Sequence, residues 1–346
     1  MRSAVLAVLA ACAPRPVASA TAQEAPAPHA AAAEPAAAPP VAAPPPVAAE
    51  PAAQDRGCID DGSPYDAAAL RARVAYLASG ELDGRASGSA GDAAARGYLA
   101  DRFRCLGLVP AGAHGSYEQP FTAAGRATAN LVGYIPGDDA TVGGDIIVVG
   151  AHHDHLGDGH LGANDNASGA AALLAIAQAV RQRGAPHRTV AFVAFGGEEL
   201  GLVGSAYFAA HPPSALPAGR IVYDVNLDMI GSYSSAGAVY AMGTFRGLPA
   251  TAIVKALSRE RPALHVGVGG RGVGSDHEAL CSAGVPYVFF WTPDKRCYHG
   301  RCDTIDNLDA AHAAEIAAFA GALVERLADS PSDLAASRTR LGCTGR

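Results

Sequence analysis

Two kinds of hydrophobic pattern alternate along most of this chain. Apolar residues three and four positions apart predict helices, whereas short apolar runs between turn residues predict strands. The run Asp-Ile-Ile-Val-Val-Gly at 145–150 is continuous, as in strands that are buried on both faces. The predicted helices are 66–78, 92–106, 167–183, 200–210, 249–259, 276–282 and 309–327, and the predicted strands are 117–121, 127–134, 145–150, 188–195, 220–227 and 285–291.

Strands that alternate with helices predict an α/β fold in one large domain, with a mostly parallel sheet that carries helices on both faces. In folds of this kind the ligand site lies beyond the carboxyl ends of the strands. We therefore expect the residues that carry the chemistry to follow the predicted strands directly.

The amino-terminal part of the chain has a different composition. Residues 13–56 contain 19 Ala and 11 Pro and show no apolar period, which predicts a disordered, semi-rigid spacer. Before it, a short apolar stretch ends in Leu9-Ala-Ala-Cys12, which resembles the lipobox of bacterial lipoproteins. We expect residues 1–12 to be a signal peptide that ends in this lipobox Cys, and residues 57–346 to be the folded domain. An ordinary secretory signal cut after Ala18-Ser-Ala20 is the alternative.

The charge and the cysteine content indicate which classes of partner the protein can bind and in which cellular compartment it lies. The chain has a formal net charge of −7 and no basic cluster, so a nucleic-acid partner is not expected. No apolar run reaches the roughly 20 residues of a membrane span, so membrane contact would run only through a lipid anchor on Cys12. Both interpretations of the amino terminus export the protein, as a cell-envelope lipoprotein or as a secreted or periplasmic protein. The six other cysteines can then form disulfides.

Histidines and an acid follow the continuous strand. In extended backbone alternate side chains share a face, so His152 and Asp154 are expected to point together and His153 to point away. A carboxylate beside a histidine can fix the orientation of a metal-binding imidazole. His155 would lie on the same strand face as His153.

Further acids and a histidine follow the later strands. Asp165 precedes a predicted helix, where a turn or helix-capping role is the alternative. Glu198 and Glu199 follow the next strand, and such a pair is costly to bury unless a cation compensates. A solvated pair at a helix start is the alternative there. Asp228 and His299 follow two further strands.

Together these segments deliver two imidazoles and three carboxylates to one edge of the sheet. Nitrogen and oxygen donors of this kind suit Zn²⁺. Five ligands are too many for one catalytic zinc ion that keeps a water, but they suit two ions that share a bridging carboxylate. The sequence therefore predicts a site for two zinc ions per chain.

Six motifs in this order make the chain resemble the M28 metallopeptidases, the co-catalytic zinc aminopeptidases. They are AHHDHLG at 151–157, GANDNASG at 162–169, GGEELGLVGSAYF at 196–208, NLDMIG at 226–231, GSDHEAL at 274–280 and CYHGRCDTIDNL at 297–308. The stretch YLASGELDGRASGSAG at 76–91 resembles the lead-in to that family's domain. The resemblance implies the zinc-exopeptidase fold, a deeply twisted mixed sheet with helices on both faces.

The resemblance also implies which residues hold the metal ions. His152 and Asp228 would bind one zinc ion, Glu199 and His299 would bind the other, and Asp165 would bridge the two.

Three further roles follow from the same resemblance. Glu198 would be the general base, Asp154 would orient the first histidine ligand, and Tyr298 would donate to the developing oxyanion. His155 and His160 are alternative candidates for metal ligands, but the family pattern assigns neither of them to metal.

The CYHGRC segment is narrower, because it resembles a subgroup in which the two cysteines form a small disulfide. That disulfide would be Cys297–Cys302; free thiols or a pair with Cys281 are the alternatives. Cys58, Cys105 and Cys343 are left without an assigned partner, as is Cys281.

The activity implied is an exopeptidase that removes residues from the free amino terminus of peptides. A carboxypeptidase of the same family is an open alternative, because Arg246, Arg261 and Arg271 could receive a terminal carboxylate. A glutaminyl cyclase uses a single zinc ion on this fold, and the presence of both His152 and Asp228 argues against it. A non-catalytic binding homologue is a further alternative. The presence of all the expected ligand residues argues against it. A serine hydrolase is unsupported, because the chain contains no G-x-S-x-G.

Overall fold

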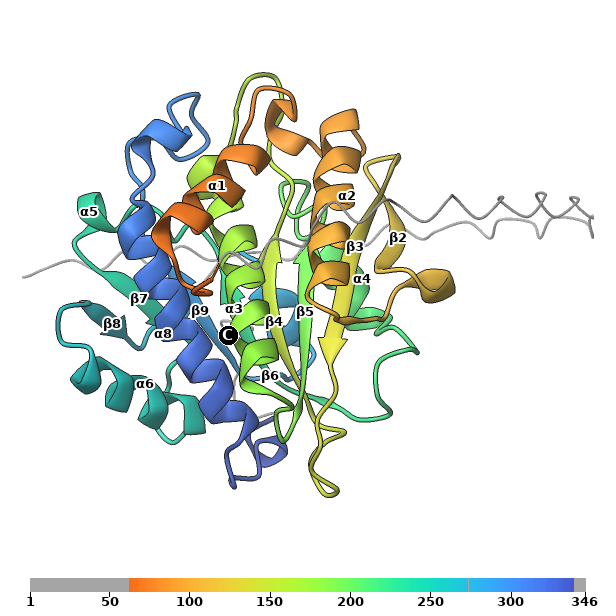
Figure 1. Ribbon diagram of the computed structural model, residues 1–346, viewed down its shortest axis with the longest axis vertical. Coiled ribbons are helices and arrows are strands. Elements are labelled where there is room, and N and C mark those ends of the chain that lie inside the picture. The colour runs from red at the N-terminus through yellow and green to blue at the C-terminus, as the bar shows by residue number, and fades with distance from the viewer. Residues whose placement is uncertain (1–61, 273, 339–346) are drawn as a thin grey trace, which may run out of the picture. The chain divides into compact units, whose positions relative to one another are not determined.

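The computed structural model describes residues 62–272 and 274–338, in which one sheet of nine strands carries helices on both faces (Figure 1). The strands are Val109–Pro110 (β1), Glu118–Ala123 (β2), Arg126–Ile135 (β3), Ile146–His152 (β4), Thr189–Phe195 (β5), Ile221–Leu227 (β6), Val239–Met242 (β7), Val266–Val268 (β8) and Tyr287–Trp291 (β9). Their order is β1-β3-β5-β4-β6-β9-β7-β8, and β2 pairs with β3 outside this path.

The centre of the sheet is parallel, antiparallel pairings join it to the strands on either side, and the outer pair β7 and β8 is again parallel. β5, β4, β6 and β9 pair in parallel, whereas β3 runs antiparallel to β5 and β7 runs antiparallel to β9. Every residue of β4, β5 and β6 is buried, as the continuous apolar runs predict. The carboxyl ends of the four central strands lie at the upper edge of the sheet in Figure 1, opposite to the arrowhead of β3. The predicted mixed sheet with helices on both faces is confirmed.

Two layers of helices cover the sheet. The helices are Ala67–Leu77 (α1), Ala90–Cys105 (α2), Gly169–Arg183 (α3), Val203–Ala210 (α4), Tyr233–Ala236 (α5), Pro249–Glu260 (α6), His277–Ser282 (α7) and Ala310–Ala328 (α8). The larger core contains buried residues of α1, α2, α3, α6 and α8, while the smaller one contains Phe208 of α4 and Leu280 of α7. Because these cores bury different sets of strand side chains, α4 and α7 lie on the face of the sheet opposite to α3 and α8.

Several helices begin at side chains that cap them. Asp66 accepts a hydrogen bond from the N–H of Ala69 at the start of α1, and Ser89 does the same for Asp92 in α2. Asp309 caps α8 through the N–H of His312. Each such cap is worth about 1 kcal/mol and fixes where the helix begins.

The predicted elements are found within a few residues of their expected ends, and the short ones were missed. β1, β7, β8 and α5 have two to four residues each, too few to show a period in the sequence. The predicted signal peptide (1–12) and spacer (13–56), with Cys12, lie outside the described residues. No helix in the described part of the chain combines the length and the apolar character that a membrane span needs.

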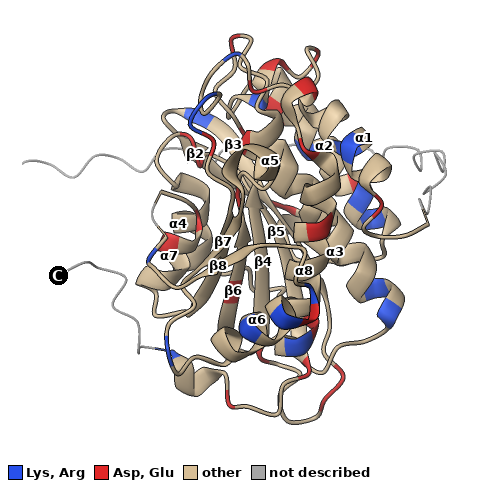
Figure 2. Cartoon of the chain, turned by 90° about the vertical axis from the view of Figure 1, so that its left-hand side faces the viewer, with Lys and Arg blue, Asp and Glu red and all other residues tan. Residues whose placement is uncertain are grey.

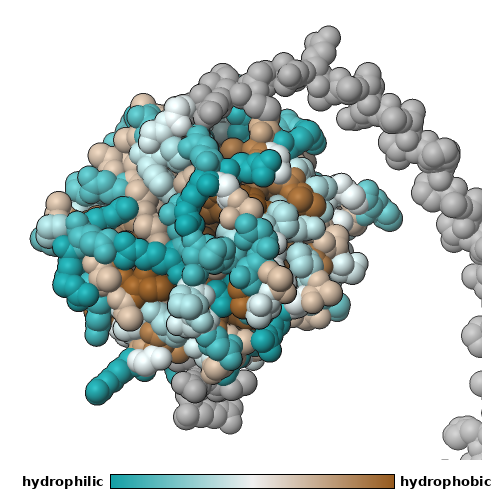
Figure 3. Space-filling model, turned by 60° about the horizontal axis from the view of Figure 1, so that its bottom comes forward, coloured by the Kyte–Doolittle hydropathy of each residue, from teal (hydrophilic) through white to brown (hydrophobic). Residues whose placement is uncertain are grey.

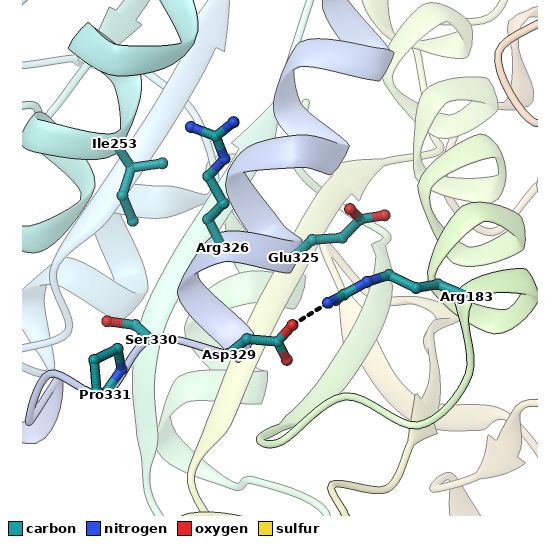
Figure 4. A pocket seen from close by; sticks show the side chains of 7 residues that line it. All are labelled: Arg183, Ile253, Glu325, Arg326, Asp329, Ser330 and Pro331. Atoms are coloured by element: carbon teal, nitrogen blue, oxygen red, sulfur yellow. Dashed lines mark hydrogen bonds and ion pairs between the residues drawn. The ribbon is translucent and has the colours of Figure 1, made fainter.

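A hollow of about 370 Å³ lies at the carboxyl ends of α3 and α8 (Figure 4). It is lined by Arg183, Ile253, Glu325, Arg326, Asp329, Ser330 and Pro331. Arg183 pairs with Asp329 across it, and Arg326 pairs with Glu260. The hollow is therefore bordered by charges that neutralise one another. It is separated from the carboxyl edge of the sheet by the length of α3, about 22 Å for 15 residues.

Charged residues are spread over many elements of the chain in the view of Figure 2. Figure 2 shows Lys and Arg mainly on the helices and an acidic position on β6, the strand that contains the buried Asp224. The face seen in Figure 3 is mainly hydrophilic, with small separate apolar areas. The acids and histidines meet elsewhere, at the carboxyl edge of the sheet.

Candidate metal centre

The first group of side chains surrounds the imidazole of His152, the last residue of β4. His152 is 1% exposed, and its Nε2 lies 3.3 Å from Oδ1 of Asp228 and 3.4 Å from Oδ1 of Asp165. Asp228 directly follows β6, so the parallel pairing of β4 with β6 brings these two residues together. Burial opposes protonation of His152, but the carboxylates of Glu198 and Asp228 raise its pKa well above the ordinary value.

A second group joins Asp165 to Glu199 and His299. Nε2 of His299 lies 3.2 Å from Oδ2 of Asp165 and 3.2 Å from Oε2 of Glu199. Asp165 thus presents one carboxylate oxygen to His152 and the other to His299. Burial raises the pKa of Asp165, against the effect of its hydrogen bond with His299. Its position between two histidines is the one that a bridging carboxylate needs.

Glu198 and Glu199 follow β5 and are both largely buried. Oε2 of Glu198 lies 4.0 Å from Nε2 of His152. Burial raises the pKa of Glu198 to about 10, against the attraction of His152 and with the added repulsion of Asp276. Burial also raises the pKa of Glu199. Ionising both groups here is costly, and a divalent cation beside them would supply the compensating positive charge.

Asp154 lies fully buried beside the first group and accepts hydrogen bonds from two other segments. Oγ of Ser87 donates to its Oδ2 at 2.8 Å, and the backbone N–H of Glu198 donates to its Oδ1 at 3.2 Å. Nδ1 of His152 lies 3.1 Å from the backbone carbonyl oxygen of Asp154 and 3.8 Å from its Oδ1. The nearest group to that nitrogen is therefore the carbonyl of Asp154 rather than the carboxylate that the sequence suggested.

His155 points into the site, so the expectation that it shares the direction of His153 is wrong. Its Nδ1 lies 2.7 Å from Oε1 of Glu199 and 3.9 Å from Oδ2 of Asp165. The physical reason is that β4 ends at residue 152, so the backbone beyond it no longer alternates. Burial lowers the pKa of His155 to about 4, which makes it a neutral partner of Glu199 at ordinary pH.

The other two histidines of this region lie outside the site. His153 points away as predicted, with its Nε2 3.0 Å from Oδ1 of the buried Asp92. Nδ1 of His160 lies 2.9 Å from the carbonyl oxygen of Gly157. Neither contact reaches the two groups of acids.

Asp303 was not predicted, although it holds the segment that carries Asp165. Its two carboxylate oxygens accept hydrogen bonds from the backbone N–H groups of Asn164 at 2.7 Å and of Asp165 at 2.9 Å. Burial raises the pKa of Asp303 to about 6, against the effect of these two bonds. The only sequence signal for it was its position directly after Cys302 in the last motif.

The loop that carries His299 is closed by the Cys297–Cys302 disulfide, the pairing that the resemblance implied. The rings of Tyr298 and His299 stack with centroids 3.9 Å apart. Tyr298 is 56% exposed, and partial burial with repulsion from Asp165 raises its pKa to about 12. Its hydroxyl is thus a neutral hydrogen-bond donor at the mouth of the site.

Two groups of ligand atoms in the described residues lie close enough to hold a metal ion. One consists of His152, Asp165 and Glu199, the other of His152, Glu198 and Asp228, and within each group the atoms lie within 4.8 Å of one another. Nitrogen and oxygen donors in a buried site fit zinc. Glu198 thus lies where it could act either as a general base or as a ligand.

Sequence comparison relates the chain to peptidases. The model of peptidase family M28 matches residues 130–324. The chain is 31% identical over 254 residues to leupeptin-inactivating enzyme 1 of Streptomyces exfoliatus, a match that covers 68% of this chain and 56% of the relative. It is 38% identical over 97 residues to aminopeptidase YwaD of Bacillus subtilis, covering 28% of this chain and 21% of that protein. The chain therefore spans about half or less of these curated relatives.

Solved structures share the fold. BSAP, a zinc aminopeptidase from Bacillus subtilis, matches with a TM-score of 0.65 and 17% identity, over 79% of this chain and 98% of that one. The LapA aminopeptidase of Legionella pneumophila matches with a TM-score of 0.62 and 21% identity, over 77% of this chain and 72% of that one. At these identities the likeness establishes the fold.

Proposed function

Because this chain belongs to peptidase family M28, we propose that it is a dinuclear zinc aminopeptidase that removes residues from the amino terminus of peptides. The observation that carries the proposal is the carboxylate of Asp165 between His152 and His299 at the carboxyl edge of the sheet. The printed names of two similar proteins, aminopeptidase YwaD and the zinc aminopeptidase BSAP, support it.

The five predicted ligands divide between two ions. We assign His152 and Asp228 to the first zinc ion, Glu199 and His299 to the second, and Asp165 to both, because its two oxygens face the two histidines. When bound, two zinc ions lower the pKa of water and polarise a peptide carbonyl.

The protein's own groups would supply the proton transfers and the orientation. Glu198 would take a proton from the attacking water and return it to the leaving amine, because its carboxyl lies beside the first group, with Oε2 4.0 Å from Nε2 of His152. The neutral hydroxyl of Tyr298 would donate a hydrogen bond to the oxyanion that develops on the scissile carbonyl. Asp154 would hold His152 with its Nε2 toward the acids, through the contact at Nδ1.

The acidic surroundings favour a substrate that brings a positive charge. Glu198, which is assigned to neither ion, lies beside His152, and a carboxylate at this position can attract the ammonium group of a free amino terminus. A peptide with a blocked amino terminus would lose that attraction. This is the basis for choosing an aminopeptidase over a carboxypeptidase, which would receive a terminal carboxylate instead.

We further infer that the protein is exported. All four cysteines among the described residues are disulfide-bonded, namely Cys105, Cys281, Cys297 and Cys302. Disulfides persist in oxidising compartments, which supports a cell-envelope or secreted protein. Lipid attachment at Cys12 belongs to the same proposal.

The test is hydrolysis of a leucine nitroanilide compared with its N-acetyl derivative by the full chain loaded with zinc. We expect turnover of the free amine and a loss of at least 100-fold for the acetylated compound. Equal turnover of both compounds would contradict the aminopeptidase assignment, and turnover that survives complete removal of metal would contradict the zinc assignment.

A further inference from the structure

Residues 83–87, here called the brace, lie against the loop at 153–162, here called the metal loop. The brace follows α1, and the metal loop connects β4 to the segment that carries Asp165. Oδ1 of Asp83 accepts a hydrogen bond from the N–H of Gly159 at 2.8 Å, and Oγ of Ser87 donates to Asp154. The two segments therefore touch at both ends of the brace.

Gly84 lies so close to the metal loop that no side chain fits between them. A Cβ on Gly84 would come within 2.0 Å of the carbonyl oxygen of His160. Asp83, Gly84 and Arg85 also have φ angles of 43°, 70° and 56°, a left-handed conformation that favours glycine. Asp83 and Arg85 are not glycines, so this backbone conformation is strained at both residues. Such strain persists only where surrounding contacts stabilise it.

Arg85 supplies those contacts. Its side chain is fully buried, and its guanidinium donates to backbone carbonyls at both ends of the metal loop. Nε donates to His153 at 2.7 Å, Nη1 to Leu161 at 2.8 Å, and Nη2 to Gly162 at 2.9 Å. Nη1 also donates to the carbonyl of Leu77 at 2.5 Å, which ties the group to the end of α1. The planar guanidinium of Arg85 therefore joins the two ends of the metal loop.

We propose that Arg85 is a positioning residue for the metal centre: by tying residue 153 to residues 161 and 162, it sets the distance between His152 and Asp165. This inference rests on the proposed function, because the metal centre is what Arg85 positions. His152 immediately precedes the first carbonyl that the guanidinium holds, and Asp165 follows the last by three residues. Ser87 adds to the effect, because its hydroxyl also accepts from the N–H of Gly197, next to Glu198.

Charge and geometry at Arg85 act on zinc binding in opposite directions. The guanidinium lies near Asp154, Asp303 and Asp165, and burial lowers its own pKa to about 10. Removing a positive charge from this position would by itself favour a divalent cation. Removing the guanidinium and its hydrogen bonds would let His152 and Asp165 move apart and would weaken zinc binding. Arg85→Lys keeps a basic side chain but loses the planar set of donors, so it acts mainly on the geometry.

Arg188 offers a matched control. It is 1% exposed and donates to backbone carbonyls of Ala328, Ser330 and Ser332, at the start of β5 rather than at its carboxyl end. Arg188→Lys therefore removes the same kind of clamp from the opposite edge of the sheet. Both variants should lose thermal stability.

The experiment measures zinc affinity of the metal-stripped full chain by competition with a chelating dye, together with the melting temperature. We expect Arg85→Lys to bind zinc 10- to 100-fold more weakly than the wild type, the range for residues that orient metal ligands, and Arg188→Lys to stay within threefold. In zinc-saturated Arg85→Lys, kcat should fall by a similar factor while KM changes less than twofold.

A zinc affinity of Arg85→Lys within threefold of Arg188→Lys, or tighter than the wild type, would overturn the proposal. If Arg85→Lys does not fold, Ser87→Ala takes its place, with a three- to tenfold weaker zinc affinity expected and an unchanged one overturning the positioning role of the brace. Failure of the proposed function would look different, because the wild type itself would then bind no zinc.

Discussion

Removal of metal should make the stability of this protein fall steeply as pH rises. Burial raises the pKa of Glu198 from 4.5 to about 10. Between these two values the folded, metal-stripped protein keeps a proton on Glu198 that the unfolded chain has released. Stability falls with rising pH wherever the folded state holds more protons than the unfolded state. The stabilisation is thus complete below pH 4.5 and is lost progressively up to pH 10.

The size of the effect follows from one retained proton. Each pH unit removes about 1.4 kcal/mol from the free energy of unfolding, hence about 4 kcal/mol between pH 6 and pH 9. For a domain of this size that corresponds to a fall in melting temperature on the order of 10 °C. Burial also raises the pKa values of Glu199 and Asp165, which changes the stability in the same direction over the pH range in which each of them titrates.

Calorimetry of EDTA-stripped and zinc-loaded protein at pH 6, 7.5 and 9 measures this slope. The gap between the two melting temperatures should widen with pH, because metal binding needs deprotonated ligands. Stripped Glu198→Gln serves as the control and should lose about 1.4 kcal/mol per pH unit of the slope. A melting temperature of the stripped protein that stays flat or rises between pH 6 and pH 9 would refute the reasoning, as would an unchanged slope in the variant.

Three further predictions concern other parts of the chain. Asp303→Asn leaves one backbone N–H of the Asp165 segment without an acceptor, so chemical denaturation should show a loss of about 1–3 kcal/mol, and an unchanged stability would contradict the role of Asp303. Replacing Cys297 and Cys302 by Ser opens only a short loop, whose disulfide is worth less than the roughly 3 kcal/mol of a 15-residue loop. Activity should therefore fall by more than tenfold with a melting temperature lowered by only a few degrees, and the reverse pattern would contradict it. Cys12→Ser should move the protein from the detergent phase to the aqueous phase on phase partition, and wild-type protein in the aqueous phase would exclude the lipid anchor.

The central strands were predictable because their apolar runs are long and lie between turn residues. The run predicted at 145–150 proved to be β4, and it continues to His152 because His152 pairs with Phe195 of β5. A polar residue in the last position of a strand cannot be recognised from hydrophobicity. Short strands such as Val266–Val268 were not predicted for a related reason, because three residues are too few to show a hydrophobic period.

Most of the acids and histidines of the site were predictable because they lie at the ends of strands, or in the segments that follow strands, at one edge of the sheet. His155 was misplaced because its direction depends on where β4 ends, which neighbouring strands decide. Arg85 and Asp303 were missed for another reason. The neighbouring residues in the sequence do not distinguish a buried arginine or aspartate from an exposed one. The hydrogen-bond partners of Arg85 and Asp303 are backbone groups far away in the sequence. Only the folded chain brings those groups together.

Zinc content and turnover of the wild type and of Glu198→Gln, measured on the same preparations, decide whether Glu198 is the general base of a dinuclear zinc site. We expect two zinc ions per chain in both proteins and a kcat about 10²–10⁴ times lower in the variant, because the substitution removes a general base and no metal ligand. Near-normal turnover in Glu198→Gln would contradict the assignment. So would the loss of a zinc ion, which would make Glu198 a ligand beside His152 and Asp228 instead.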